Sequence, residues 1–198
     1  MNFDDDTIKK LIDSITACDE IKLSDIPCID LYMDQVTTLF NDKLKSFKRD
    51  ENDKLLTKTM INNYTKSKIL MSAKNKKYTK QHIILLILTY NLKQMLSIND
   101  IHDFFAPILK NVILKDENSN ILDDIYSSFL EMKAEEMDNF KKNIFSKINL
   151  IKEKDFSTKD KSDNELIKLM LLVLMLNNEA TLLKRMSEKL IDTYFKAP

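Results

Sequence analysis

The chain has 198 residues, 43% of them hydrophobic and 31% charged, and its 31 basic and 31 acidic residues give a formal net charge of zero. This size and composition indicate a soluble globular protein of one or two domains. There is no glycine, and there are only three prolines. Because tight β-hairpins and phosphate-binding loops depend on glycine, the composition argues against a β-rich fold, a dinucleotide-binding fold and a phosphate-loop enzyme.

The N-terminal residues and the apolar runs predict a cytoplasmic protein without membrane insertion. Residues 1–6 are acidic and contain no signal-like apolar core. The longest apolar run, residues 169–176, is far shorter than the ~20 residues of a membrane span. Cys18 and Cys28 have no metal-binding or redox spacing, so we expect reduced thiols and predict neither a metal nor a cofactor.

Two helices are predicted before residue 45. Apolar residues at helical spacing indicate a short helix over residues 4–17. The stretch Ser24-Asp25-Ile26-Pro27 is a helix-start signal, and a second helix should follow to about Leu44. This second helix is expected to bury Ile29, Met33, Val36 and Phe40. The polar residues 45–53 are predicted to form a loop.

The next stretch predicts a capped helix and a connector. Thr57 is a suitable N-cap for a helix that ends near Ser67, with Ile61 and Tyr64 facing inward. Residues 70–77 are too few for a further helix and suit a small wing or an extended connector. Since no glycine is present, we expect the chain to turn through Asn75.

A strongly apolar helix is predicted from Thr79 to about Leu96. Leu85 and Leu86 widen its apolar face, so it should be covered on more than one side. Its inner face is expected to consist of Ile83, Ile84, Ile87, Leu88, Leu92 and Met95. Ser97 and Asp100 then have the spacing of a helix start, and Pro107 should end or kink that helix.

The remainder of the chain predicts a separate helical module. We expect helical structure over residues 108–114, a long helix over 121–151 and a charged linker over 152–161. A capping box at Ser162-Asp163-Asn164-Glu165 should start a last helix. That helix either continues to Phe195 or breaks near Asn177-Asn178. The fold class is therefore all-α, with domains over residues 1–106 and 107–198.

Positive charge is concentrated in one segment. Residues 54–99 contain nine lysines and no Asp or Glu, whereas an average stretch of 46 residues would hold about seven acids (31/198 × 46). The rest of the chain carries 22 basic and 31 acidic residues, a net charge of −9. A neutral protein with its positive charge in one place is typical of a surface that meets an anion, most often nucleic acid.

The same segment resembles the MerR-type winged helix over roughly residues 31–105. In that family a recognition helix with Leu-Arg-Tyr-Tyr is followed by Gly-Leu, by a wing that closes on Arg-x-Tyr, and by a Ser-Leu-x-Glu-Ile turn. At the corresponding places this chain has Ile61-Asn62-Asn63-Tyr64, Lys68-Ile69, Lys76-Lys77-Tyr78 and Ser97-Ile98-Asn99-Asp100-Ile101. With residues 29–36 and 56–64 included, the chain also resembles the uncharacterised bacterial YkrK-like proteins, a family with a domain of unknown function.

The resemblance implies a helix-turn-helix that binds double-stranded DNA and a role as a transcriptional regulator. Asn62 or Asn63 would reach adenine edges, and the lysines would contact phosphates. The predicted DNA-binding residues are Lys58, Asn62, Asn63, Lys66, Lys74, Lys76, Lys77 and Lys80. The helix face alone would better suit an ordinary solvated surface. The alternative function is a non-enzymatic interaction module whose basic face binds an acidic protein or an anionic membrane surface.

An enzyme is not predicted. His82 and His102 are expected at the surface or half-buried. The clustered carboxylates of the long helix fit a solvated face; they are Glu131, Glu135, Glu136 and Asp138. Since helix-turn-helix proteins usually bind DNA as two-fold dimers, we expect a homodimer through residues after Pro107. The C-terminal module would serve dimerisation or the sensing of an unknown small-molecule effector.

Overall fold

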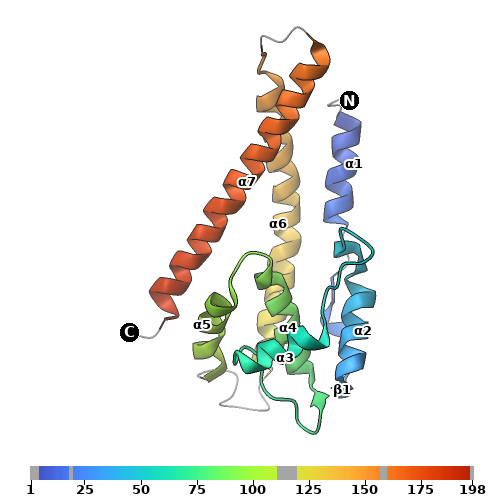
Figure 1. The fold of residues 1–198 in the computed structure, drawn as a ribbon, viewed down its shortest axis with the longest axis vertical. Coiled ribbons are helices and arrows are strands. Elements are labelled where there is room, and N and C mark those ends of the chain that lie inside the picture. The colour runs from blue at the N-terminus through green and yellow to red at the C-terminus, as the bar shows by residue number, and fades with distance from the viewer. Residues whose placement is uncertain (1–4, 18–19, 111–119, 157–159, 197–198) are drawn as a thin grey trace. The chain divides into compact units, whose positions relative to one another are not determined.

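In the computed structural model, which describes residues 5–17, 20–110, 120–156 and 160–196, the chain is mostly helical (Figure 1). The helices within these ranges are α1 (Asp5–Thr16), α2 (Met33–Lys43), α3 (Lys58–Lys66), α4 (Lys80–Lys93), α5 (Ile98–Ile108), α6 (Ile121–Lys152) and α7 (Lys161–Tyr194). Two 3₁₀ turns, η1 (Leu23–Asp25) and η2 (Lys45–Phe47), and two strands, β1 (Leu31–Tyr32) and β2 (Lys77–Tyr78), complete the described part. The predicted all-α class is confirmed.

The chain divides into two compact units. The larger unit consists of Cys18–Leu130 and Met186–Pro198, and the smaller unit of Met1–Ala17 and Glu131–Arg185. Helices α6 and α7 contribute residues to both units. The division predicted from the sequence, between residues 106 and 107, stays a prediction.

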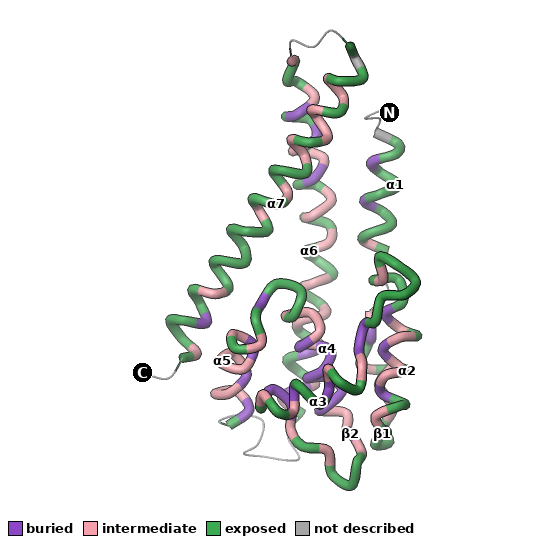
Figure 2. Tube along the Cα trace, viewed as in Figure 1, coloured by how far each residue is buried: buried purple, intermediate pink, exposed green. Residues whose placement is uncertain are grey.

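Helix α4 forms the centre of the larger unit's core. Its residues 83–86 are fully buried, and Figure 2 shows buried positions on successive turns of this helix. The expectation that α4 is covered on more than one side is confirmed. The predicted inner face was wrong at its C-terminal end, because Leu88 and Leu92 are only half-buried and Met95 is 41% exposed. Thr89 is buried instead, and its hydroxyl donates a hydrogen bond to the Leu85 carbonyl at 2.7 Å.

The predicted start of the second helix was wrong. Residues after Ser24 form only the single turn η1, and α2 begins at Met33. Ile29, which the prediction buried, is 70% exposed. Between the turn and the helix, β1 pairs antiparallel with β2, Leu31 opposite Tyr78 and Tyr32 opposite Lys77. The start signal failed because this pairing with a distant strand holds residues 31 and 32 extended.

The smaller unit packs α1 against α6 and α7. Ile8 and Ile12 of α1 share a buried cluster with Ile144 and Ile148 of α6, and Leu172 of α7 packs against it. Lys147 forms an ion pair with Glu179 at 2.9 Å. The predicted helices over 4–17 and 121–151 are confirmed to within a residue or two.

Helix α7 is continuous. The break near Asn177 does not occur, and within the helix the Asn177 side-chain amide donates a hydrogen bond to the Val173 carbonyl at 2.9 Å. The predicted capping box at Ser162 was wrong. Asp160 precedes the first turn, and its carboxylate accepts a hydrogen bond from the Ser162 N–H at 2.9 Å.

Much of the apolar surface of α7 is exposed. In the smaller unit the exposed side chains include Leu166, Met170, Val173, Leu174, Leu182 and Leu183. By length and composition alone, α7 is also the one helix in the described ranges that could cross a membrane, and its most apolar window is not buried. One such helix is weak evidence for a membrane span, and the absence of membrane insertion stays a prediction.

Some predictions concern residues outside the described ranges. These are the thiol of Cys18, helical structure over residues 111–114, and the middle of the charged linker, residues 157–159. Cys28, which is described, is exposed and forms no disulfide with a described residue.

Candidate nucleic-acid interface

Helix α3 has one buried and one polar face, as predicted. The Thr57 hydroxyl accepts a hydrogen bond from the Met60 N–H at 3.1 Å, which confirms the predicted N-cap. Ile61 and Tyr64 are buried, and burial raises the pKa of the Tyr64 hydroxyl. The opposite face exposes the predicted residues Lys58, Asn62, Asn63 and Lys66.

The end of α3 is closed by a left-handed residue that is not glycine. Lys68 has φ of 58° and donates its N–H to the Thr65 carbonyl at 3.0 Å. The Ile69 N–H donates to the Tyr64 carbonyl at 3.0 Å. These two bonds make a Schellman motif, in which glycine usually occupies the left-handed position. Lys68, which the site prediction omitted, is therefore an exposed lysine fixed at the end of α3.

The connector after α3 contains a tight turn at the predicted residue. Asn75 and Lys76 have φ of 53° and 63°, and the Lys77 N–H donates to the Lys74 carbonyl at 2.9 Å. Positive φ at both central residues is the geometry of a type I′ hairpin turn. Lys74 and Lys76 are exposed on this turn. Lys77 is half-buried, with its ammonium 5.5 Å from the centroid of the Tyr32 ring.

Two of the predicted lysines have acidic partners that sequence reasoning missed. Lys58 forms an ion pair with Asp34 in the first turn of α2. Lys80 forms one with Asp123 in the first turn of α6, at 2.5 Å. Lys66 and Lys76 form no ion pair with a described residue. Acidic neighbours therefore neutralise Lys58 and Lys80 more than the lysines at the end of α3 and on the hairpin turn, which can contact an external anion.

His82 anchors the start of α4 beneath the connector. The prediction of a surface or half-buried residue was wrong, because His82 is buried. Its Nδ1 accepts hydrogen bonds from the Thr79 N–H at 3.2 Å and the Thr79 hydroxyl at 2.8 Å, which leaves the ring proton on Nε2. Nε2 has no hydrogen-bond partner among the described residues, although the backbone of Ser72 and Met71 lies close to the ring. Burial lowers the pKa of this imidazole.

The connection from α2 to α3 is longer than in a simple helix-turn-helix. It covers residues 44–57, whereas the usual turn has 3–4 residues. The predicted loop over 45–53 is largely irregular but contains the turn η2. Buried Leu44, Leu55 and Leu56 attach both ends of this connection to the core. The longer loop therefore leaves α2 and α3 packed on the same core.

The described part of the larger unit is thus an α-helical body with a short two-stranded sheet and a lysine- and asparagine-rich surface on α3 and the hairpin turn. Among the described residues, no group of three or more His, Cys, Asp or Glu side chains could hold a metal ion. Residues 21–129, more than half of the chain, match the family described as a domain of unknown function, DUF1836, and the chain belongs to this family. No curated protein and no solved structure matches the chain. The matched residues fall within the larger unit.

Proposed function

We propose that this protein is a cytoplasmic, non-enzymatic transcriptional regulator that binds double-stranded DNA through α3 and the hairpin turn at residues 74–77. In this proposal the larger unit is a MerR-like winged helix-turn-helix and the family is that of the YkrK-like proteins. Helix α3 would lie in the major groove, with Asn62 and Asn63 at base edges. The turn would contact the phosphate backbone as a wing.

The observation that carries the proposal is the outer face of α3 together with the turn. Asn62, Asn63, Lys66, Lys68 and Lys76 are all exposed. The 46 residues 54–99 that contain them hold no acidic side chain. The chain runs in the order β1, α2, α3, hairpin turn and β2, and β1 pairs with β2. This pairing also supports a wing that is attached to the start of the helix-turn-helix. Such a surface suits a polyanion with grooves wide enough for a helix.

The test is the salt dependence of binding to duplex DNA. We expect log K to fall steeply against log salt concentration, by about 0.9 for each phosphate that is contacted. The double variant Lys76→Ala with Lys77→Ala should weaken binding to all sequences about equally and flatten this slope by about one to two units. Fluorescence anisotropy with a labelled duplex at several salt concentrations measures both quantities.

The matched control is Lys9→Ala with Lys10→Ala, which removes the same charge from exposed positions on α1. It should leave affinity and slope unchanged. A slope near zero for the unaltered protein would remove the DNA proposal and favour an acidic protein partner or an anionic membrane surface. An equal loss in both double variants would show that net charge, and not this surface, determines binding.

We also propose that the protein is a homodimer through residues after Pro107. A single recognition helix contacts too few base pairs for useful specificity, so regulators of this kind bind two half-sites. The exposed apolar positions of α7 in the smaller unit recur at intervals of three and four residues, as in Leu166, Met170, Val173 and Leu174. This spacing forms one stripe on a helix and suits packing against a second copy.

A further inference from the structure

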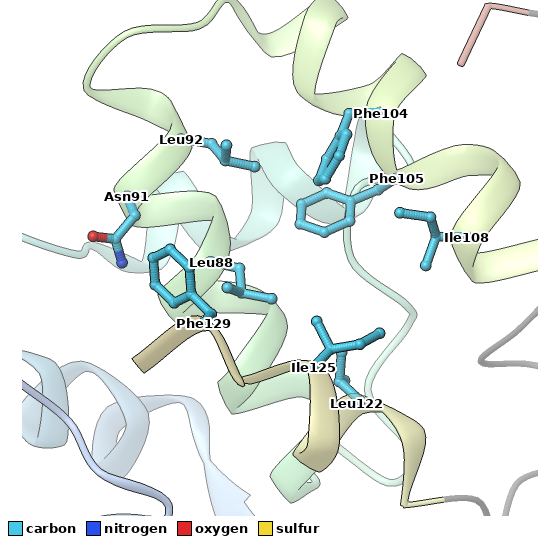
Figure 3. A pocket seen from close by; sticks show the side chains of 9 residues that line it. All are labelled: Leu88, Asn91, Leu92, Phe104, Phe105, Ile108, Leu122, Ile125 and Phe129. Atoms are coloured by element: carbon cyan, nitrogen blue, oxygen red, sulfur yellow. The ribbon is translucent and has the colours of Figure 1, made fainter. Parts of the chain in front are cut away.

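The larger unit contains an apolar cavity of about 410 Å³ between α4, α5 and α6, shown in Figure 3. Each of the three helices contributes three lining side chains, and all nine belong to the larger unit. Protein interiors are normally close-packed, with few voids larger than a water molecule. The neighbouring core follows this rule, since Ile84, Leu85 and Leu86 are fully buried. The space beside them has the size of a small-molecule site.

The lining of the cavity excludes a charged ligand. Eight of the nine side chains are hydrocarbon, and none is charged. Figure 3 shows the rings of Phe105 and Phe129 beside this space, with Phe104 near its edge. Aromatic rings pack well against other aromatic rings in offset or edge-to-face contacts. An ion moved into such a lining would lose its hydration without gaining a partner.

One polar group lies at the rim. The Asn91 side-chain nitrogen donates a hydrogen bond to the Ile87 carbonyl at 2.9 Å, which fixes the amide. In Figure 3 its oxygen points away from the other lining side chains, so the amide adds no polar group inside the apolar space. Ile125, on α6, is 38% exposed, and Leu88 and Ile108 are half-buried, which leaves the cavity open to solvent on one side.

We propose that this cavity is a binding site for a small, neutral aromatic molecule. Its ring system would lie against Phe105, Phe129 and Leu88. If the protein is the regulator proposed above, this molecule would be its effector. The evidence for the binding site itself comes only from the cavity.

The test uses full-length protein with ¹³C-labelled methyl groups on Ile and Leu, and 2-naphthol as the probe. We expect saturable chemical-shift changes at Ile125, Ile108 and Leu88. The methyl groups of Ile144 and Ile148, in the buried cluster of the smaller unit, should not move. The anion 2-naphthoate, which has nearly the same shape, should bind at least tenfold more weakly. No DNA is present, so failure here leaves the proposed function untouched, and failure of DNA binding leaves this site untouched.

Ile125→Trp should fill the cavity and weaken 2-naphthol binding at least tenfold. The matched control is Met95→Trp, at an exposed position just after α4 that does not line the cavity. It should bind like the unaltered protein. The proposal is overturned if no saturable shift appears, if the shifts are confined to exposed α7 residues such as Leu174 and Leu182, or if 2-naphthoate binds equally well. These outcomes are read from the unaltered protein, so they decide the question even if Ile125→Trp does not fold.

Discussion

Lys68 shows how a chain without glycine closes a helix, at an energetic cost. A left-handed conformation costs a residue with a Cβ about 1–2 kcal/mol, and glycine avoids this cost. Lys68 has φ of 58° and an exposed side chain, so nothing in the packing requires the lysine. Its exposed side chain adds a positive charge beside the end of α3.

We therefore expect Lys68→Gly to stabilise the larger unit by about 0.5–1 kcal/mol, since the relief of the left-handed strain exceeds the added freedom of the unfolded chain. Urea unfolding measures this change. Lys66→Gly, in the last turn of α3 with ordinary helical geometry, is the control and should destabilise by up to about 1 kcal/mol. Equal destabilisation by both variants would contradict the strain argument. In the DNA-binding proposal, Lys68→Gly should also weaken binding although it stabilises the fold.

His82 predicts a pH dependence of stability. Its pKa is lowered in the folded protein, so the unfolded chain binds the proton more readily. The folding free energy should therefore weaken as pH falls below about 6.5, the ordinary value for histidine. Protonation would also remove the acceptor at Nδ1 that Thr79 uses. Asp30 and Lys74 are the charged groups that act on the ring from the neighbouring segments, with opposite effects.

Urea midpoints at pH 7.5 and 5.5 check this expectation. His82→Gln places a glutamine at the third residue of α4, where its side-chain oxygen can accept the Thr79 N–H as in an ordinary capping box. Glutamine does not titrate, so this variant lacks the protonation of His82. This variant should lose less stability between the two pH values than the unaltered protein. The same loss of stability between the two pH values in both proteins would show that other groups cause it.

Helix α4 determines the stability of the larger unit. Leu86→Ala removes a fully buried side chain from a close-packed surrounding and should cost about 2–5 kcal/mol. Leu88→Ala, two residues further on, should cost less, because Leu88 is half-buried and lines the cavity. Thermal or urea unfolding of the two variants compares them directly. If Leu88→Ala lost more stability than Leu86→Ala, Leu88 would have to be close-packed, and the space beside it would be occupied by other side chains.

Several helix ends and faces were predictable from local signals, although the local start signals at Ser24 and Ser162 gave wrong predictions. The cap at Thr57, the buried pair Ile61 and Tyr64, and the turn at Asn75 each follow from residues a few positions apart. Even the turn without glycine could be predicted, because asparagine tolerates left-handed geometry better than most residues. The face of α3 that carries the candidate site was predictable for the same reason.

Features that depend on distant partners could not be predicted. The strand at Leu31 and Tyr32 exists because it pairs with residues 77 and 78. The ion pair of Lys80 with Asp123 joins residues 43 positions apart, and no local pattern marks it. The burial of His82 depends on the connector that covers it, and the cavity depends on three helices at once. In each case the missing information is the tertiary arrangement, which overrides local preference.

The exposed apolar surface of α7 is the feature of this protein that most needs an explanation. Soluble proteins rarely leave a long contiguous apolar stripe in water, and such stripes usually mark an interface. Within the smaller unit, α7 buries one side against the cluster of Ile144 and Ile148, and Leu172 packs there. Positions such as Met170 and Leu174 remain more than half exposed. A second copy of the chain would cover them symmetrically, because in a two-fold dimer the same patch serves both subunits.

We therefore expect sedimentation equilibrium of the full-length protein at micromolar concentration to give about twice the chain mass of 23.2 kDa. Met170→Lys with Leu174→Lys places two charges on the stripe and should shift the protein to monomer. The control is Met132→Lys, on an exposed position of α6 in the same unit. It should remain a dimer. Monomeric behaviour of the unaltered protein would refute the dimer and would require residues of the same chain to cover the stripe. A dimer that survives the double substitution would place the interface elsewhere.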